Sequence, residues 1–545
     1  MPADLLIIGA DVFTPQGVVA GPLLVHDGRI AAIGDEAAER APGGVEVLEA
    51  PGGLVVPGFQ DAHVHPYHAG LDLLSCDLRD GEHADDYLAT IAAYGTAHPD
   101  AEWIVGGGWS MEAFPGGTPA AVELDLVTQG RPAFLKNRDG HGAWVNTAAL
   151  EAAGVDADTP DPADGRIERH PDGRPTGTLH EGAMALVARL LPPIGDDRID
   201  EAFRVAQRQL LAWGVTGWQD AMVGAVDGTP DLLDSYLRLA DAGELVARVV
   251  GALWWQRDLG LEQVDELVAK RERAAGRERF AATTVKIMQD GVAENFTAGM
   301  TENYLDADGN DSGNAGKSFL DPALLREAAV ALDGHGFQLH VHALGDRAVR
   351  EALDAVEAAR SANGPRDARH TLAHLQVVHP DDVPRFAALG VVANAQPLWA
   401  AHERQMDELT IPFLGPRRAR WQYPFGSLAR AGARIAIGSD WPVSTADPLE
   451  LLHTAVNRCA PHATGDDRRP FLGEQALSLA DALTAATAGS AFVNHDDARA
   501  GRIAPGLAAD LAVLDRDPFA SPVEQIAATI VSATVVGGAV VHRVT

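Results

Sequence analysis

Residues 54–66 read Leu-Val-Val-Pro-Gly-Phe-Gln-Asp-Ala-His-Val-His-Pro, an apolar run that ends in two histidines and a proline. The near-continuous apolar character predicts a buried β-strand, and Pro66 ends it. Because side chains alternate along a strand, His63 and His65 share one face, about 6.6–6.8 Å apart along the chain. Imidazoles at that spacing can reach one metal ion with nitrogens at about 2.0–2.1 Å. The alternative is a pair of unrelated surface histidines, and this stretch alone leaves both open.

Seven further apolar runs of strand length follow the first, and helical patterns separate several of them. The helices are expected at residues 323–335, 348–362 and 380–389. Eight strands joined by helical crossovers predict an α/β protein with a closed, TIM-like (β/α)8 barrel, and an open doubly wound sheet is the runner-up. The expected barrel strands are 54–64, 215–220, 248–254, 284–289, 338–343, 371–375, 391–395 and 433–438.

Both ends of the chain show a different sequence pattern, which predicts short strands separated by Gly and Asp-Gly turns. Neither end has enough strands to bury a core alone, so residues 1–56 and 501–545 are expected to form one composite β-sandwich domain. The alternative is that each end of the chain forms a separate small β unit. The barrel then occupies residues 57–500. The gap between the first two barrel strands is too long for one crossover, which predicts an insertion at about 67–213.

Composition limits the class of protein. The 545 residues carry a formal net charge of −34, and 46% are hydrophobic, which predicts a large folded core. Such a negative field argues against nucleic-acid binding and against an anionic membrane surface. No apolar run is long enough for a membrane span, and the first residues lack the features of a signal peptide. Only Cys76 and Cys459 occur, so no disulfide framework is expected, and we expect a cytoplasmic protein.

Further metal-binding side chains stand at the carboxyl ends of other predicted strands. His340 and His342 end the fifth strand, His374 ends the sixth and Asp440 follows the eighth. Strand carboxyl ends converge on one mouth of a barrel, where catalysis takes place. A lone histidine is more often a structural group than a ligand, but five histidines with an aspartate favour a metal site.

Lys286 is one of only four lysines, and it lies inside the apolar run Thr284-Val-Lys-Ile-Met. A buried ammonium is costly and tends to lose its proton. A neutral amine can capture carbon dioxide as a carbamate, which offers two oxygens to bridge two cations. A lysine that snorkels or pairs with an acid such as Asp290 is an equal alternative on these grounds.

Taken in order, these motifs resemble the amidohydrolase superfamily, the urease-related metal hydrolases. The resemblance is to family 3, with its N-substituted formamide deformylase-like and exoenzyme-regulatory-protein-like members, and it covers essentially the whole chain. It implies a TIM-like barrel beside a composite β-sandwich. The motifs are Val56-Pro-Gly-Phe, the His63/His65 pair, Arg138-Asp-Gly-His141 with Trp144-Val-Asn, Val285-Lys286, His342-Ala-Leu-Gly-Asp346, His374-Leu-Gln376, Gln396-Pro397, Gly438-Ser-Asp440 and the Gly501–Leu511 segment.

The resemblance also implies a set of ligands. His63 and His65 would bind the more buried ion with Asp440, whereas His342 and His374 would bind a second ion. Lys286, carboxylated, would bridge the two. His342 rather than His340 matches the family pattern His-Ala-x-Gly-Asp, which leaves His340 as a packing or supporting group. Imidazole, carboxylate and carbamate ligands suit two zinc ions, although manganese or iron fits as well.

The implied activity is hydrolysis of a non-peptide C–N bond, amide or formamide-like, in a small molecule. Metal-bound hydroxide would attack the carbonyl, and Asp440 would pass the water's proton to the departing nitrogen. Deamination of a small heterocycle is one alternative, and a non-catalytic metal-binding or regulatory protein on this scaffold is another. A homodimer is the oligomeric state we expect.

Candidate substrate contacts lie in the predicted insertion. Asp139 and His141 are expected to bond the carbonyl or the leaving group, with loop bracing as the alternative. Trp109 and Trp144 would offer an aromatic wall, or simply pack the insertion. Glu181 is a further candidate for the mouth of the site.

Overall fold

The computed structural model describes residues 4–79, 81–138, 140, 142–162, 165–225 and 230–544. The chain divides into two compact units. Unit 1 comprises Met1–His65 and Gln207–Thr545, and unit 2 comprises Pro66–Ala206.

Unit 1 contains an eight-stranded parallel barrel, which confirms the predicted fold class. Its strand order is β21-β20-β19-β18-β17-β16-β15-β8. The backbone N–H of Asp440 donates to the carbonyl of His63 at 2.8 Å, and that of His65 donates to the carbonyl of Trp441 at 2.9 Å, which brings the two ends of the sheet together. The strands are β8 (Phe59–Val64), β15 (Val215–Val223), β16 (Arg248–Trp254), β17 (Phe280–Met288), β18 (Gln338–Ala343), β19 (Thr371–His374), β20 (Val392–Ala395) and β21 (Ile435–Ile437).

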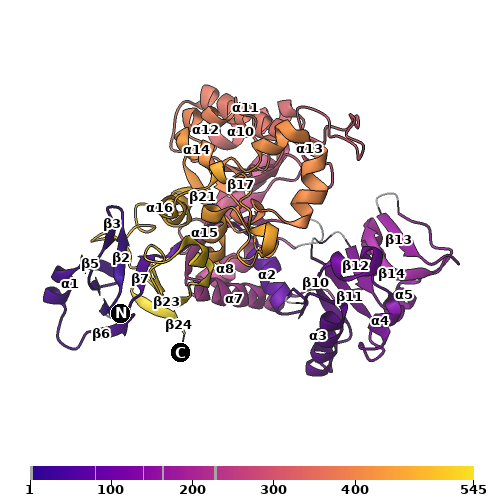
Figure 1. Cartoon of the computed structure of the whole chain (residues 1–545), viewed down its shortest axis with the longest axis horizontal. Helices are drawn as coiled ribbons and strands as arrows, with labels where there is room; N and C mark the ends of the chain where they lie inside the picture. The colour runs from indigo at the N-terminus through magenta and orange to yellow at the C-terminus, as the bar shows by residue number, and fades with distance from the viewer. Residues whose placement is uncertain are drawn as a thin grey trace. The chain divides into compact units, whose positions relative to one another are not determined.

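Helices cover the outside of the barrel, and α10, α11, α12 and α14 lie side by side in Figure 1. Local sequence accounts for where they begin. Asp321 caps α10 by accepting the backbone N–H of Ala323, and Pro322 occupies the first turn, where no N–H is needed. The helices of this layer are α8 (Leu233–Asp241), α9 (Val264–Ala274), α10 (Pro322–Gly334), α11 (Asp346–Asn363), α12 (Val383–Leu389), α14 (Phe425–Arg430) and α15 (Pro448–Asn457).

Strands from both ends of the chain share one sheet, in the order β24-β23-β22-β7-β2-β3. A second sheet, β5-β4-β1-β6, faces it across one apolar core that contains Leu5 and Val25 from the second sheet and Val55, Leu511 and Val535 from the first. The composite sandwich of the fold prediction is thereby confirmed. The strands are β1 (Leu5–Ile8), β2 (Asp11–Thr14), β3 (Gly17–Val19), β4 (Leu23–His26), β5 (Arg29–Ile33), β6 (Glu46–Glu49), β7 (Leu54–Pro57), β22 (Leu511–Leu514), β23 (Val531–Val536) and β24 (Ala539–Arg543).

The expectation of one strand over residues 54–64 was wrong, because the run divides at Gly58 into β7 and β8. The backbone N–H of Gly58 donates to Asp510 of the sandwich, whereas that of Phe59 donates to Gly214 of the barrel. A Cβ on Gly58 would lie 2.3 Å from Oγ1 of the buried Thr216. Glycine therefore lets the chain pass from sandwich to barrel against a packed neighbour.

Unit 2 contains a six-stranded mixed sheet in the order β13-β14-β12-β11-β10-β9. Trp109, Phe114 and Trp144 pack together at its core. Its elements are α2 (Pro66–Leu73), β9 (Cys76–Asp77), α3 (Ala84–Ala97), β10 (Ile104–Trp109), α4 (Ala121–Asp125), β11 (Ala133–Asn137), β12 (Gly142–Val145), α5 (Thr147–Ala153), β13 (Gly165–Arg169) and β14 (Pro175–Glu181), and α7 (Asp196–Ala212) crosses into unit 1.

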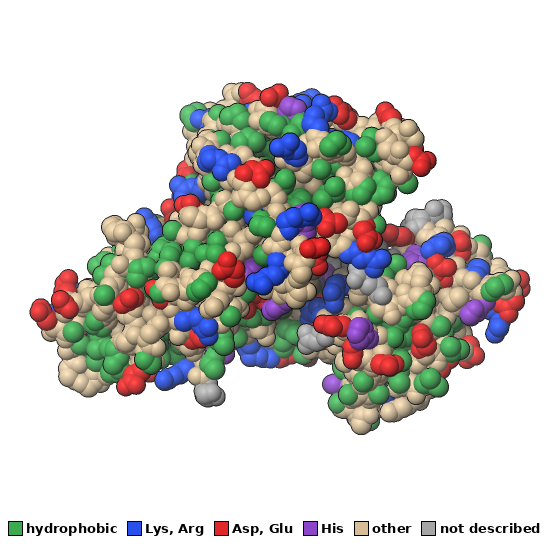
Figure 2. All heavy atoms as spheres, viewed as in Figure 1, with side chains coloured by type: hydrophobic (Ala, Val, Ile, Leu, Met, Phe, Trp, Pro, Cys, Tyr) green, Lys and Arg blue, Asp and Glu red, His purple; other side chains and the backbone are tan. Residues whose placement is uncertain are grey.

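Acidic side chains on the face drawn in Figure 2 are spread among basic and hydrophobic ones rather than gathered in one patch. Within the described ranges no single helix is long and apolar enough to cross a membrane, although the bent pair Gly465–Gln475 and Leu479–Val493 passes the same test of length and composition.

Candidate metal centre

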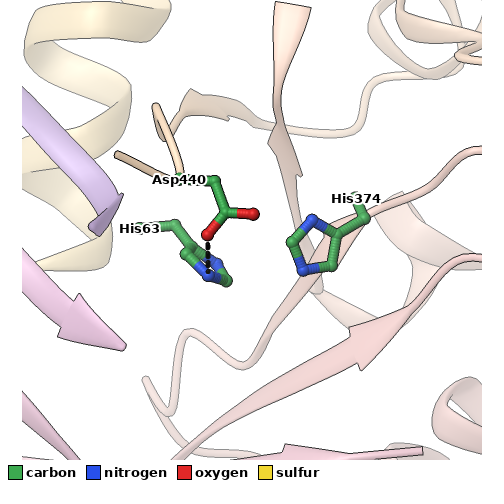
Figure 3. A group of neighbouring side chains, drawn as sticks. All are labelled: His63, His374 and Asp440. Carbon is green, nitrogen blue, oxygen red and sulfur yellow. Dashed lines mark ion pairs between the residues drawn. The ribbon is translucent and has the colours of Figure 1, made fainter. Parts of the chain in front are cut away.

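Side chains from opposite ends of the barrel sheet meet at the carboxyl ends of its strands. His63 ends β8, His374 ends β19 and Asp440 follows β21, and one donor atom from each lies within 4.8 Å of the other two. Figure 3 shows the two imidazoles and the carboxylate turned toward one another. Nε2 of His63 is 3.2 Å from Oδ1 of Asp440, and all three residues are buried.

The other three predicted ligands contact this group. Nε2 of His65 lies 3.0 Å from the same Oδ1 of Asp440, and Nζ of Lys286 lies 3.5 Å from Nε2 of His63. The ring of His342 packs against that of His374, with centroids 4.3 Å apart. The structure thus brings together all six side chains proposed as ligands, while their coordination of a metal stays a prediction.

Backbone geometry at two of these positions is unusual. Asp440 has φ 59° and His374 has φ 81°, both in the left-handed region that non-glycine residues seldom adopt. The backbone N–H of His374 donates to Oε1 of Gln396 at 2.7 Å, which helps to hold this conformation. Such strain persists where the surroundings fix it, and it clusters at functional sites.

Burial keeps the imidazoles neutral. It lowers the pKa of His63 and of His374 well below the ordinary value, with nearby cationic groups adding to the effect. The pKa of His342 is lowered to about 3 for the same reasons. Neutral imidazole is the form that binds a metal ion, so these rings are in the right protonation state at neutral pH.

The charged partners of the site are affected in different ways. Burial lowers the pKa of Lys286 from 10.5 to about 7, so a large fraction of the amine is uncharged near neutrality. Burial alone would raise the pKa of Asp440, but the hydrogen bond from His65 and the charges of His65, His374 and Lys286 outweigh it and lower that pKa. The centre therefore combines an ionised carboxylate with the neutral imidazoles of His63, His342 and His374.

This donor set fits a divalent cation. Nδ1 of His374 is buried and has no hydrogen-bond partner among the described residues, which is costly unless another group binds it. Imidazole nitrogens with a carboxylate oxygen suit zinc and related transition metals.

Several groups around the centre were missed by the sequence analysis. Oδ1 of Asp61 accepts the backbone N–H groups of His63 at 2.9 Å and Ser439 at 3.1 Å, and burial raises the pKa of Asp61 to about 7. The indole of Trp399 stacks on His374, with centroids 5.3 Å apart. Asp61 could have been found, because it precedes His63 by two positions on the same strand and so shares its face. No sequence pattern around Trp399 identifies it as a residue of the site.

The predicted substrate contacts belong to unit 2. Asp139 and His141 lie outside the described residues. Trp109 and Trp144 are 1% and 0% exposed, and their indole N–H groups donate to the carbonyls of Leu135 and Ala120, so both rings serve the core of the unit, as the packing alternative expected. Glu181 is exposed and has φ 50°. Contact between these residues and a substrate stays a prediction.

An eight-stranded parallel barrel with a polar cluster at the carboxyl ends of its strands is the arrangement of a TIM-barrel enzyme. Residues 46–542 match the amidohydrolase family. The chain therefore belongs to the amidohydrolase family, as its motifs predicted.

Two curated relatives and one solved structure support this membership. Protein LONG AFTER FAR-RED 3 of Arabidopsis thaliana is 32% identical, over 98% of this chain and 91% of its own length. N-substituted formamide deformylase of Arthrobacter pascens is 30% identical, over 94% of each chain. The crystal structure of an uncharacterized metal-dependent hydrolase from Pyrococcus furiosus superimposes with a TM-score of 0.72 at 25% identity, covering 94% of this chain and 99% of that one.

Proposed function

We propose that the protein hydrolyses a non-peptide C–N bond, of the amide or formamide type, in a small molecule. The observation that carries the proposal is the group of donor atoms on His63, His374 and Asp440 within 4.8 Å of one another. Relatedness to N-substituted formamide deformylase supports a formamide or amide as the scissile group.

His63, His65 and Asp440 would hold one divalent cation, and His342 with His374 would hold a second. Lys286 would join them as a carbamate, which its position beside His63 and its lowered pKa support. We favour zinc on the nature of the donors. A cation held by these residues would lower the pKa of a water ligand toward about 7 and would polarise a carbonyl.

Asp440 would move the proton in this reaction. Its pKa is lowered, so the carboxylate is ionised at neutral pH and able to accept a proton. Oδ1 lies 3.2 Å from Nε2 of His63 and 3.0 Å from Nε2 of His65, so the carboxylate points into the centre. After accepting the proton of the attacking water, Asp440 would return it to the departing nitrogen.

The test is metal analysis of the purified protein together with a panel of N-substituted formamides, linear amides and cyclic amides. We expect cation binding and turnover of at least one member of the panel, and neither in a His63→Gln, His374→Gln double variant. Ammonia release from amino-heterocycles with no amide cleavage would instead indicate a deaminase. Bound cation without turnover of any compound would favour a non-catalytic role.

A further inference from the structure

A chain of buried hydrogen bonds leads away from the candidate metal centre into the barrel interior. It starts at Nδ1 of His63, which lies 2.9 Å from Nε2 of His340. Nδ1 of His340 is bonded to Oε1 of Gln219, and Nε2 of Gln219 donates to Oε1 of Gln338 at 3.0 Å. His63, His340, Gln219 and Gln338 are at most 2% exposed. No bulk water therefore competes for these bonds.

The far end of the chain fixes its direction. Nε2 of Gln338 donates to the backbone carbonyls of Arg369 at 2.7 Å and Val493 at 3.0 Å. Carbonyl oxygens only accept, so the amide of Gln338 cannot be flipped without placing its own oxygen against two acceptors. Oε1 of Gln338 must then face inward, where it also accepts the hydroxyl of Thr284 at 2.7 Å.

Each link now determines the next. Oε1 of Gln338 is an acceptor, so Gln219 presents its NH2 group to it and its oxygen to His340. His340 must therefore carry its proton on Nδ1, which leaves Nε2 as an acceptor. His63 must donate from Nδ1 to that acceptor, and its Nε2 keeps a free lone pair. That Nε2 faces Asp440 and Lys286.

We propose that this chain sets the tautomer of His63, and that His340, Gln219 and Gln338 are positioning residues for the cation. The inference rests on the proposed function, because a lone pair on Nε2 matters only if a cation binds there. It deepens that function by identifying the buried residues that leave a lone pair on Nε2 of His63 in the cation-free protein. Within the described ranges, no buried side-chain nitrogen or oxygen atom of His63, His340, Gln219 or Gln338 lacks a partner, which agrees with a single defined arrangement of these four residues.

The tautomer can be read directly in the cation-free, full-length protein labelled with 15N-histidine. Long-range 1H–15N correlation distinguishes protonated from unprotonated ring nitrogens, and a His63→Gln variant assigns the signals of His63. We expect the proton on Nδ1 of both His63 and His340. A proton on Nε2 of His63 would overturn the inference, and this result does not depend on whether the protein binds a cation or hydrolyses an amide.

Zinc affinity, measured by competition with a chromogenic chelator, provides the second readout. We expect His340→Leu to weaken zinc binding about 10- to 100-fold, as loss of a group that orients a ligand does. His340→Gln, whose amide oxygen can still accept from His63, should lose less. His453→Leu removes another buried histidine, which contacts Cys459 at 3.9 Å, and should leave zinc affinity unchanged.

If His340→Leu fails to fold, Gln338→Met tests the same chain from its anchored end and should also weaken zinc binding. Wild-type affinity in the folded His340→Leu or Gln338→Met variant would contradict the proposal. So would an equal loss in His453→Leu, since the effect would then come from general destabilisation. Failure of the wild-type protein to bind zinc would instead defeat the proposed function, and the tautomer measurement would still decide the inference.

Discussion

Nζ of Lys286 lies 3.5 Å from Nε2 of His63, although 223 positions separate the two residues in the chain. The contact joins β17 to β8 across the barrel, and both side chains are buried. A lysine amine offers a single donor atom, so the proposed bridging of two cations by Lys286 depends on its modification by carbon dioxide.

Replacing Lys286 with alanine should lower kcat/KM by more than about 100-fold, because loss of one electrostatic stabiliser already costs that much. Added acetate or propionate should restore part of the activity by supplying the missing carboxylate oxygens. Native mass spectrometry of the wild-type protein should show the added mass of one carbon dioxide. Lys270→Ala, which removes a lysine paired with Asp231 and Glu266, is the control and should stay active. Full activity of Lys286→Ala without an additive would contradict the proposal that Lys286 bridges two cations.

The pH dependence of stability should report the burial of unmodified Lys286. Its pKa falls from 10.5 in the unfolded chain to about 7 in the folded one. Between these values the unfolded chain binds a proton that the folded protein lacks, so the free energy of unfolding rises with pH over that window. Urea titrations of the cation-free protein should detect this rise, and Lys286→Met should flatten it. The same slope in both proteins would show that the lysine is not buried as described.

Asp440→Asn should reduce turnover by at least about 100-fold, the usual contribution of a general acid–base group. Asparagine tolerates the left-handed conformation that Asp440 adopts at φ 59°, so the fold should be kept. Circular dichroism and thermal unfolding check the fold, while steady-state kinetics check the activity. An active Asp440→Asn enzyme would mean that another group moves the proton.

Gly438→Ala should damage the centre through packing alone. A Cβ at this position would lie 2.5 Å from Cβ of His63 and 2.8 Å from its backbone nitrogen. The strand end that carries His63 must shift to relieve this clash, so we expect about 1–3 kcal/mol of destabilisation and weaker cation binding. Thermal unfolding and zinc titration measure the two effects. Gly473→Ala, where a Cβ would meet only Pro470 at 3.4 Å, is a matched control that should be neutral.

Much of the barrel could be predicted from the sequence. Its strands are near-continuous apolar runs, as in β18, where all six residues are buried, and parallel strands covered on both faces require this pattern. The break of the predicted 54–64 strand at Gly58 could not be predicted, because it depends on packing against Thr216, which lies far along the chain. Periodicity reports the faces of one strand and says nothing about which neighbour packs against each residue.

The candidate site, too, could be predicted only in part from the sequence. Strand-end position was enough to single out His63, His374 and Asp440, because parallel strands end at one mouth. It could not distinguish His340 from His342, since both point to one face of β18. The family pattern His-Ala-x-Gly-Asp favoured His342, and the structure gives the two residues different surroundings: His340 is bonded to His63 from the barrel interior, whereas His342 packs against His374. Trp399 and Gln338 contact the site or its support through tertiary packing that no local pattern encodes.

We infer above all that the cluster around His63, His374 and Asp440 binds divalent cations. The most direct test is a crystal of the full-length protein grown with zinc, with diffraction data collected on both sides of the zinc absorption edge. We expect an anomalous peak in contact with Nε2 of His63 and the carboxylate of Asp440, and a second beside His342 and His374. Anomalous peaks elsewhere on the protein, with none at this cluster, would contradict this inference.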